Sequence, residues 1–294
     1  MSATRVRLGA PPTPRQQLAD LPMRLPLSPG AVAWLATAAG VELPWHRPTT
    51  PSLLTTRLSG PGASPPIATD EAARAELRGL GALDRDGRVR PTVLTALAAF
   101  ARAETTVDVV LVRRLSAGPV SLHAWHRRWG DRVTWLTAAG GAVELGWCGL
   151  GHWHAQLTAL PAGAQQGPRD RCGPGPRVGL TLPLPLVLGT GTAATEGRAD
   201  LLEELLSRPD ATGETEQLRL LHEGASARLR ATVAGHGPAG DRRLGIVSWL
   251  RYDDGWRSLT PVHRDGQAFV RVDPVPPTRL GTEVARLLRG VAGR

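Results

Sequence analysis

The 294-residue sequence contains no lysine, because all 35 of its basic residues are arginine. Walker A phosphate loops, Schiff-base enzymes, Ser-Lys hydrolases and protein kinases each need a lysine ammonium at a defined place. The sequence therefore excludes all four classes. Together with the abundant Ala, Gly and Pro, the use of arginine alone suggests a GC-rich coding bias.

Cysteine is nearly absent as well, since Cys148 and Cys172 are the only two. They stand in unlike sequence contexts and cannot form a disulfide framework, so we expect a reducing compartment. Long apolar runs are also missing. The longest, residues 30–43, is too short to span a membrane, and residues 1–14 lack the apolar run of a secretory signal. We expect a cytoplasmic protein without membrane insertion, with a disordered arm over residues 1–22.

The net charge of +9 and the pI near 11.2 invite comparison with nucleic-acid-binding proteins. The arginines are, however, interleaved with Asp and Glu, and only two Phe and one Tyr are available to stack on bases. No nucleic-acid-binding motif is present. We therefore expect no specific nucleic-acid partner, and an Arg-rich nucleic-acid-binding protein remains an alternative.

The pattern of apolar residues predicts three helices followed by a meander of four strands. The expected helices cover residues 25–43, 69–80 and 91–103, and the strands cover 107–115, 121–129, 133–137 and 142–147. A short helix to Leu160 follows. Residues 196–290 repeat this order, with helices at 196–206 and 214–223, strands at 227–234, 244–252, 257–262 and 267–272, and a helix at 280–288.

The repeat is also visible in the letters, because "WHRRWGDR" at 125–132 is echoed by "WLRYDDGWR" at 249–257. We expect an α+β fold with quasi-twofold symmetry, in which helical subdomains flank a central, largely antiparallel sheet. A single domain would cover residues 23–294. It would consist of two pseudo-repeats, about 69–161 and 196–290, joined by a Gly/Pro-rich linker.

One cysteine and two histidines fall within "WCGLGHWHAQL", residues 147–157. Zinc needs three or four ligands, and on a helix His152 and His154 would point to nearly opposite faces. A metal-dependent enzyme using Cys148, His152 and His154 is thus the weaker alternative. We interpret the segment as a junction between the meander and its closing helix, with Trp147 and Leu157 buried.

Other motifs give no support for catalysis. The segment "LGTGTAA" at 188–194 fits a dinucleotide-binding fingerprint, but Pro183 and Pro185 interrupt the strand that should precede it, so we expect a flexible connector. No nucleophile–base pair can be identified. We predict a protein that is not an enzyme, with no catalytic residue, metal ligand or cofactor-binding residue.

Strand alternation places Arg228 and Arg230 opposite Leu229 and Ala231, and it places Arg271 opposite its apolar neighbours. These three arginines mark either a solvated sheet face or a surface for a protein partner, since arginine is enriched at interfaces. We take Arg228, Arg230 and Arg271 as the candidate partner-binding residues.

Three segments resemble the EspG family of ESX (type VII) secretion-associated proteins of actinobacteria. They are residues 76–109, "ELRGLGALDRDGRVRPTVLTALAAFARAETTVDV", the "LTALP" pattern at 157–161, and residues 245–274, "GIVSWLRYDDGWRSLTPVHRDGQAFVRVDP". The resemblance extends over about residues 25–288. It implies a quasi-twofold α/β fold and a cytosolic, non-enzymatic chaperone that covers the apolar tip of a PE-PPE heterodimer, or of another helical ESX client, for delivery to the secretion machinery.

Overall fold

The computed structural model describes residues 21–44, 70–116, 118–163, 173–207, 214–236 and 242–292. The first half contains β1 (Met23–Leu27), α2 (Pro29–Ala39), α3 (Asp70–Gly79), α4 (Pro91–Ala101), β2 (Thr105–Leu115), β3 (Gly118–Trp129), β4 (Arg132–Ala139), β5 (Ala142–Gly149) and α5 (Leu150–Gly163). The second half contains β6 (Leu180–Pro183), α6 (Leu184–Glu196), α7 (Ala199–Leu206), α8 (Thr215–Glu223), β7 (Ala227–His236), β8 (Arg242–Tyr252), β9 (Gly255–Arg264), β10 (Gln267–Val275) and α9 (Arg279–Ala292). Apart from residues 21 and 22, the predicted arm lies outside the described residues, as does Cys172.

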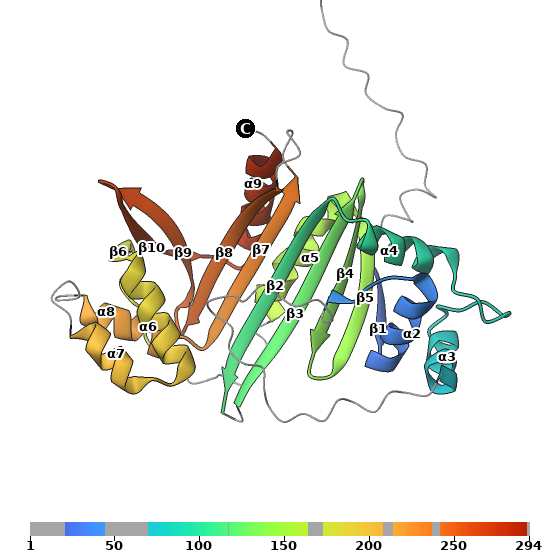
Figure 1. Cartoon of the computed structure of the whole chain (residues 1–294), viewed down its shortest axis with the longest axis horizontal. Helices are drawn as coiled ribbons and strands as arrows, with labels where there is room; N and C mark the ends of the chain where they lie inside the picture. Colours follow the sequence, from blue (N-terminus) through green and yellow to red (C-terminus); the bar gives the residue numbers. More distant parts are fainter. Residues whose placement is uncertain are drawn as a thin grey trace, which may run out of the picture.

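All ten strands form one sheet in the order β1-β5-β4-β3-β2-β7-β8-β9-β10-β6 (Figure 1). Every pairing in it is antiparallel. The first meander strands of the two halves, β2 and β7, pair at the centre, and the short strands β1 and β6 form the edges. The predicted fold class, α+β with quasi-twofold order and a central antiparallel sheet, is confirmed.

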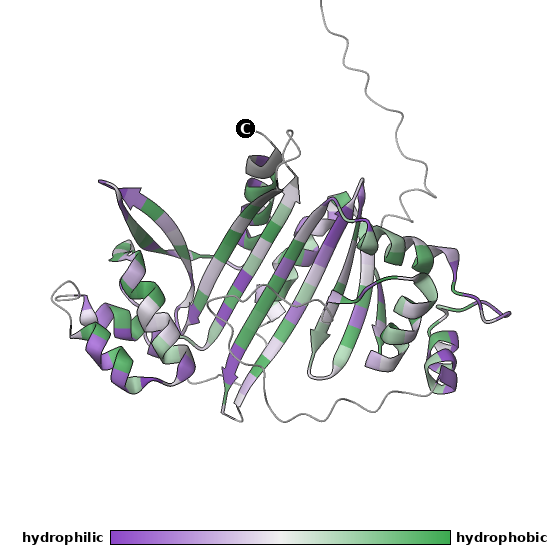
Figure 2. Cartoon of the chain, viewed as in Figure 1, coloured by the Kyte–Doolittle hydropathy of each residue, from purple (hydrophilic) through white to green (hydrophobic). Residues whose placement is uncertain are grey.

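One face of the sheet packs against α5 and α9. Strand alternation sends Val107 and Val109 of β2 and Leu229 of β7 to this face, where they join a core cluster with Trp153 of α5 and Val284 of α9. The green and purple bands that alternate along the central strands in Figure 2 follow the same period of two residues. This cluster is the main core of the molecule.

On the opposite face, the described helices lie at the two ends of the sheet (Figure 1). At one end α2, α3 and α4 pack on β4 and β5 around Leu136 and Leu145. At the other end α6, α7 and α8 pack on β8 and β10 around Leu250 and Val272. The middle of this face, formed by β2, β7 and the adjoining parts of β3 and β8, carries no helix among the described elements.

Two of the sequence predictions were wrong in detail. Residues 25–43 are not one helix, because β1 precedes α2, whose N-cap Ser28 accepts a hydrogen bond from the Ala31 amide. The segment at 188–194 is not a connector, because it lies inside α6. Pro185 lies in the first turn of this helix, where proline is tolerated. In both places proline starts a helix immediately after a short strand.

The junction between β5 and α5 has the predicted form. Trp147 and Leu157 are buried as expected, with Trp147 under α2 and α4 and Leu157 in the main core. The chain therefore changes from strand to helix directly at Leu150, and the counterpart in the second half is the passage from β10 to α9.

Candidate functional site

The part of the sheet face that no described helix covers is the candidate functional surface, and we call it the open face. It consists of Thr106, Asp108, Val110 and Val112 of β2, Ser121 and His123 of β3, Arg230 and Thr232 of β7, and Leu244, Ile246 and Ser248 of β8. All of these residues keep solvent exposure. Leu244 is 65% exposed and Ile246 is 47% exposed, which is unusual for side chains on the face of a ten-stranded sheet.

Arg228 shares this face but is not available to a partner. Its guanidinium donates to His222 Nδ1 at 3.2 Å, and burial lowers the pKa of Arg228. The other ring nitrogen of His222 lies 2.9 Å from Thr190 Oγ, which itself donates to the Leu186 carbonyl at 2.6 Å. His222 Nε2 therefore carries the hydrogen, and Arg228 fixes α8 and α6 against β7.

The structure brings together only two of the three arginines predicted to form one surface. Arg230 lies on the open face between Val110 and Ser248. Arg271 lies on the opposite face, where its Nε is 2.9 Å from Asp273 Oδ2. The reason is that Val270 and Val272 of β10 pack beneath α6, so Arg271 between them points to the other face of the sheet.

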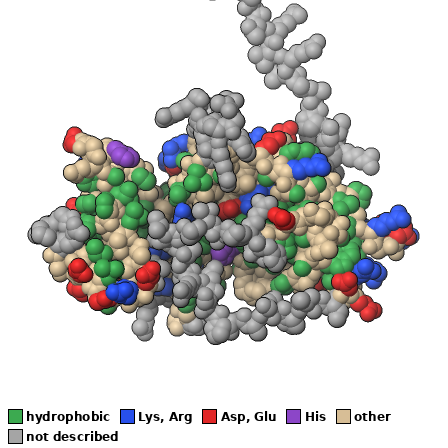
Figure 3. Space-filling model, viewed as in Figure 1, with side chains coloured by type: hydrophobic (Ala, Val, Ile, Leu, Met, Phe, Trp, Pro, Cys, Tyr) green, Lys and Arg blue, Asp and Glu red, His purple; other side chains and the backbone are tan. Residues whose placement is uncertain are grey.

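Charges near the open face are largely paired. Asp108 forms an ion pair with Arg127, whose guanidinium also lies 5.2 Å from the ring centroid of Phe100. His123 stacks on Trp125 with a centroid distance of 5.6 Å, and burial lowers the pKa of His123. Toward the two ends of the molecule, Figure 3 shows acidic and basic side chains close to one another. The open face thus combines apolar side chains with small polar ones and a single arginine, Arg230, which suits a protein partner better than a polyanion.

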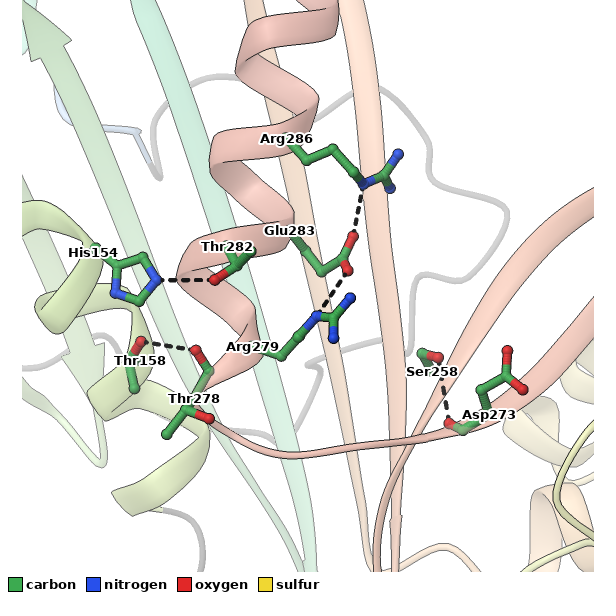
Figure 4. Close-up of polar contacts among 9 residues, drawn as sticks. All are labelled: His154, Thr158, Ser258, Asp273, Thr278, Arg279, Thr282, Glu283 and Arg286. Atoms are coloured by element: carbon green, nitrogen blue, oxygen red, sulfur yellow. Dashed lines mark hydrogen bonds and ion pairs between the residues drawn. The ribbon is translucent and has the colours of Figure 1, made fainter.

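Cys148, His152 and His154 do not converge on a common point. Cys148 is 2% exposed within the main core, whereas His154 lies on the side of α5 that faces α9, with Nε2 3.2 Å from Thr282 Oγ1 (Figure 4). Across the described ranges, no group of three or more His, Cys, Asp or Glu side chains could hold a metal. The two helices meet closely here, because a Cβ on Gly281 would lie 2.6 Å from the His154 ring.

A pocket of about 550 Å³ lies between α5 and the strands of the first half. Three polar side chains at this pocket bond to one another: Arg24 donates to Glu144 at 3.0 Å and to Gln156 at 2.6 Å. Deeper in, Trp153 Nε1 donates to His126 Nδ1 at 3.3 Å, and burial lowers the pKa of His126 to about 3. These residues form a structural network and show no arrangement of nucleophile and base.

No helix in the described part of the chain is long and apolar enough to cross a membrane. No protein-family model matches the sequence. A search of curated proteins by sequence also finds no match.

Among solved structures, the fold matches the Mycobacterium tuberculosis type VII secretion system chaperone EspG5, determined in complex with the PE25-PPE41 dimer. The match has a TM-score of 0.58 at 14% sequence identity, and it covers 91% of this chain and 96% of that chain. The recognised resemblance therefore holds at the level of structure, and this chain has the fold of that secretion chaperone.

Proposed function

We propose that the protein is a cytoplasmic, non-enzymatic chaperone of an ESX (type VII) secretion system. It binds a helical client, a PE-PPE-like heterodimer or a related substrate, shields the apolar tip of that client and delivers it to the secretion machinery. The observation that carries the proposal is the fold match over 91% of the chain to a chaperone determined in complex with a PE-PPE dimer. Such a role requires binding alone, without metal, cofactor or nucleic acid.

The open face supports this role. Val110, Leu244 and Ile246 present apolar surface between two helical subdomains that rise at the ends of the sheet (Figure 1). An amphipathic helix needs a groove that covers its apolar stripe, and polar groups at its border to set its orientation. Arg230 and His123 supply such groups. We also propose that the two halves are pseudo-repeats, about residues 69–161 and 196–290, which share one domain.

The test is co-expression with each small helical protein encoded beside the gene, followed by size-exclusion chromatography. A client should become soluble and co-elute. Val110→Glu and Arg230→Glu, which change the open face, should abolish co-elution. The matched control is Ala155→Glu, which adds the same charge to an exposed position of α5 on the other side of the sheet. Failure of every such client to bind would reject the proposal.

A further inference from the structure

The sheet is split between β8 and β9, which pair only over residues 249–252 and 255–258. The corresponding strands of the first half, β3 and β4, pair from residues 122–129 to 132–139. Beyond Ser258, the β9–β10 hairpin diverges from β8 and leaves an opening that we call the fork (Figure 1). The fork is bounded by residues 244–248 of β8 and 259–263 of β9.

The backbone of β8 presents hydrogen-bonding groups to the fork. The two-residue turn at Asp253 and Asp254 makes Tyr252 and Gly255 a hydrogen-bonded pair, so every second residue of β8 points its amide and carbonyl toward β9. The Arg251 carbonyl accepts from the Ser226 amide on the β7 side, which gives the same alternation. The amides and carbonyls of Leu244, Ile246 and Ser248 therefore face the fork, where no strand of the described residues pairs with them.

The two borders of the fork differ. On β9, Pro261 occupies the position that would face Ile246 if pairing continued, and proline has no amide hydrogen to donate. The β8 border contains no proline, and its Leu244 and Ile246 side chains are the exposed apolar ones. Proteins normally protect such edges, because a free apolar strand edge pairs readily with another chain.

The side of the fork next to α9 is positively charged. Glu283 is shared by two guanidiniums, with Arg279 Nε at 3.5 Å and Arg286 Nε at 3.0 Å. Figure 4 shows all three on the side of α9 that faces away from His154 and toward Asp273. One carboxylate between two arginines leaves an excess positive charge beside the β8 edge.

We propose that the free edge of β8 binds an extended acidic segment of a partner protein by strand addition. The segment runs antiparallel to β8, as in every other pair of the sheet. It places apolar residues beside Leu244 and Ile246 and acidic residues on the side of Arg279 and Arg286. The β9–β10 hairpin stands across the fork, so the edge of a second sheet would collide with it, whereas a single strand reaches β8. This site goes beyond the helix-binding role and does not depend on it.

A fluorescein-labelled eight-residue peptide of alternating Val and Glu tests the site by fluorescence anisotropy. In the bound peptide, the valines opposite Leu244 and Ile246 direct their backbone amides toward β8. The glutamates between them direct their amides away from β8, because successive residues of a strand alternate. N-methylation of two internal valines should therefore weaken binding at least about tenfold, whereas N-methylation of two glutamates should not. A Val–Lys peptide should bind more weakly than the Val–Glu peptide. Equal binding of the two methylated peptides would overturn the proposal.

The protein side is tested with Ile246→Pro, which removes the amide that faces the fork and leaves the hydrogen bonds to β7 in place. It should abolish peptide binding, while Ile246→Val should retain it, with both variants checked by thermal unfolding. The methylated peptides decide the question on the unaltered protein if the proline variant does not fold. If the protein forms a dimer and Ile246→Pro disrupts it, the free edge of β8 binds a second copy of the protein. That result would overturn the proposal. Loss of the helical client alone, through Val110→Glu, leaves peptide binding intact.

Discussion

Lowering the pH from 7 to 5 should destabilise the fold through two buried histidines. His126 is 1% exposed and lies against Trp153, and His222 is 4% exposed between Thr190 and Arg228. Burial, reinforced by nearby arginines, lowers the pKa of each to about 3. Both rings are therefore neutral in the folded protein throughout this pH range.

The size of the effect follows from proton linkage. In the unfolded chain the histidines have a pKa of about 6.5, so below that pH the unfolded state binds protons that the folded state does not. The contribution of the two neutral histidines to the free energy of unfolding is complete above pH 6.5. It is lost as the pH falls from 6.5 toward 3. Each histidine loses about 2 kcal/mol between pH 7 and 5, or about 4 kcal/mol together. His123, whose pKa burial also lowers, acts in the same direction. Glu214, whose pKa burial raises, opposes it.

The measurement is urea unfolding at pH 7, 6 and 5 at constant ionic strength. His126→Asn keeps an acceptor for Trp153, and His222→Gln keeps an amide for Thr190, while neither side chain titrates. Each variant should be less stable at pH 7 but should lose only about half as much stability on acidification. The reasoning would be refuted if the unaltered protein lost less than about 1 kcal/mol of stability between pH 7 and 5. It would also be refuted if each variant lost as much stability as the unaltered protein.

Three substitutions test close contacts. Gly281→Ala should cost about 1 kcal/mol through contact with the His154 ring, and His154→Ala should restore most of it in a double-mutant cycle. Gly146→Ala should cost about 1–3 kcal/mol and change the tryptophan fluorescence, because its Cβ would lie 2.2 Å from the Trp135 ring. Arg228→Ala should cost about 1–3 kcal/mol by leaving a buried histidine nitrogen without its donor, measured by thermal unfolding.

The two meanders could be predicted because local rules determine them. Alternating apolar residues predict the long strands, and the turns between them contain glycines with positive φ, as at Gly140 and Gly141. β1 and β6 could not be predicted in this way. They have five and four residues, contain prolines, and pair with strands that lie far away in the sequence. These two segments become strands because they pair with β5 and β10 at the edges of the folded sheet.

The candidate site was harder to predict than the fold. Alternation tells which residues of one strand share a face, but it does not tell which helices cover that face. Arg271 was assigned to the wrong group for this reason. Arg228 was assigned to the partner surface because strand alternation does not show that the preceding helix packs its His222 against Arg228. One signal was available: β8, "RRLGIVSWLRY", is apolar on both faces, with Ile246 on one and Val247 on the other. A strand of that kind needs a partner on its second face.

The position of the open face follows from the order of the elements. Each half places its helix group on its own outer strands, and β2 and β7 join the halves at their inner strands. The helix groups therefore stand at opposite ends, while α5 and α9 cover the middle of the other face. The shape of the surface is thus set by the architecture, which survives at 14% identity. Under the proposed function, the choice of client then rests on the side chains of the open face, foremost on Arg230 and Val110.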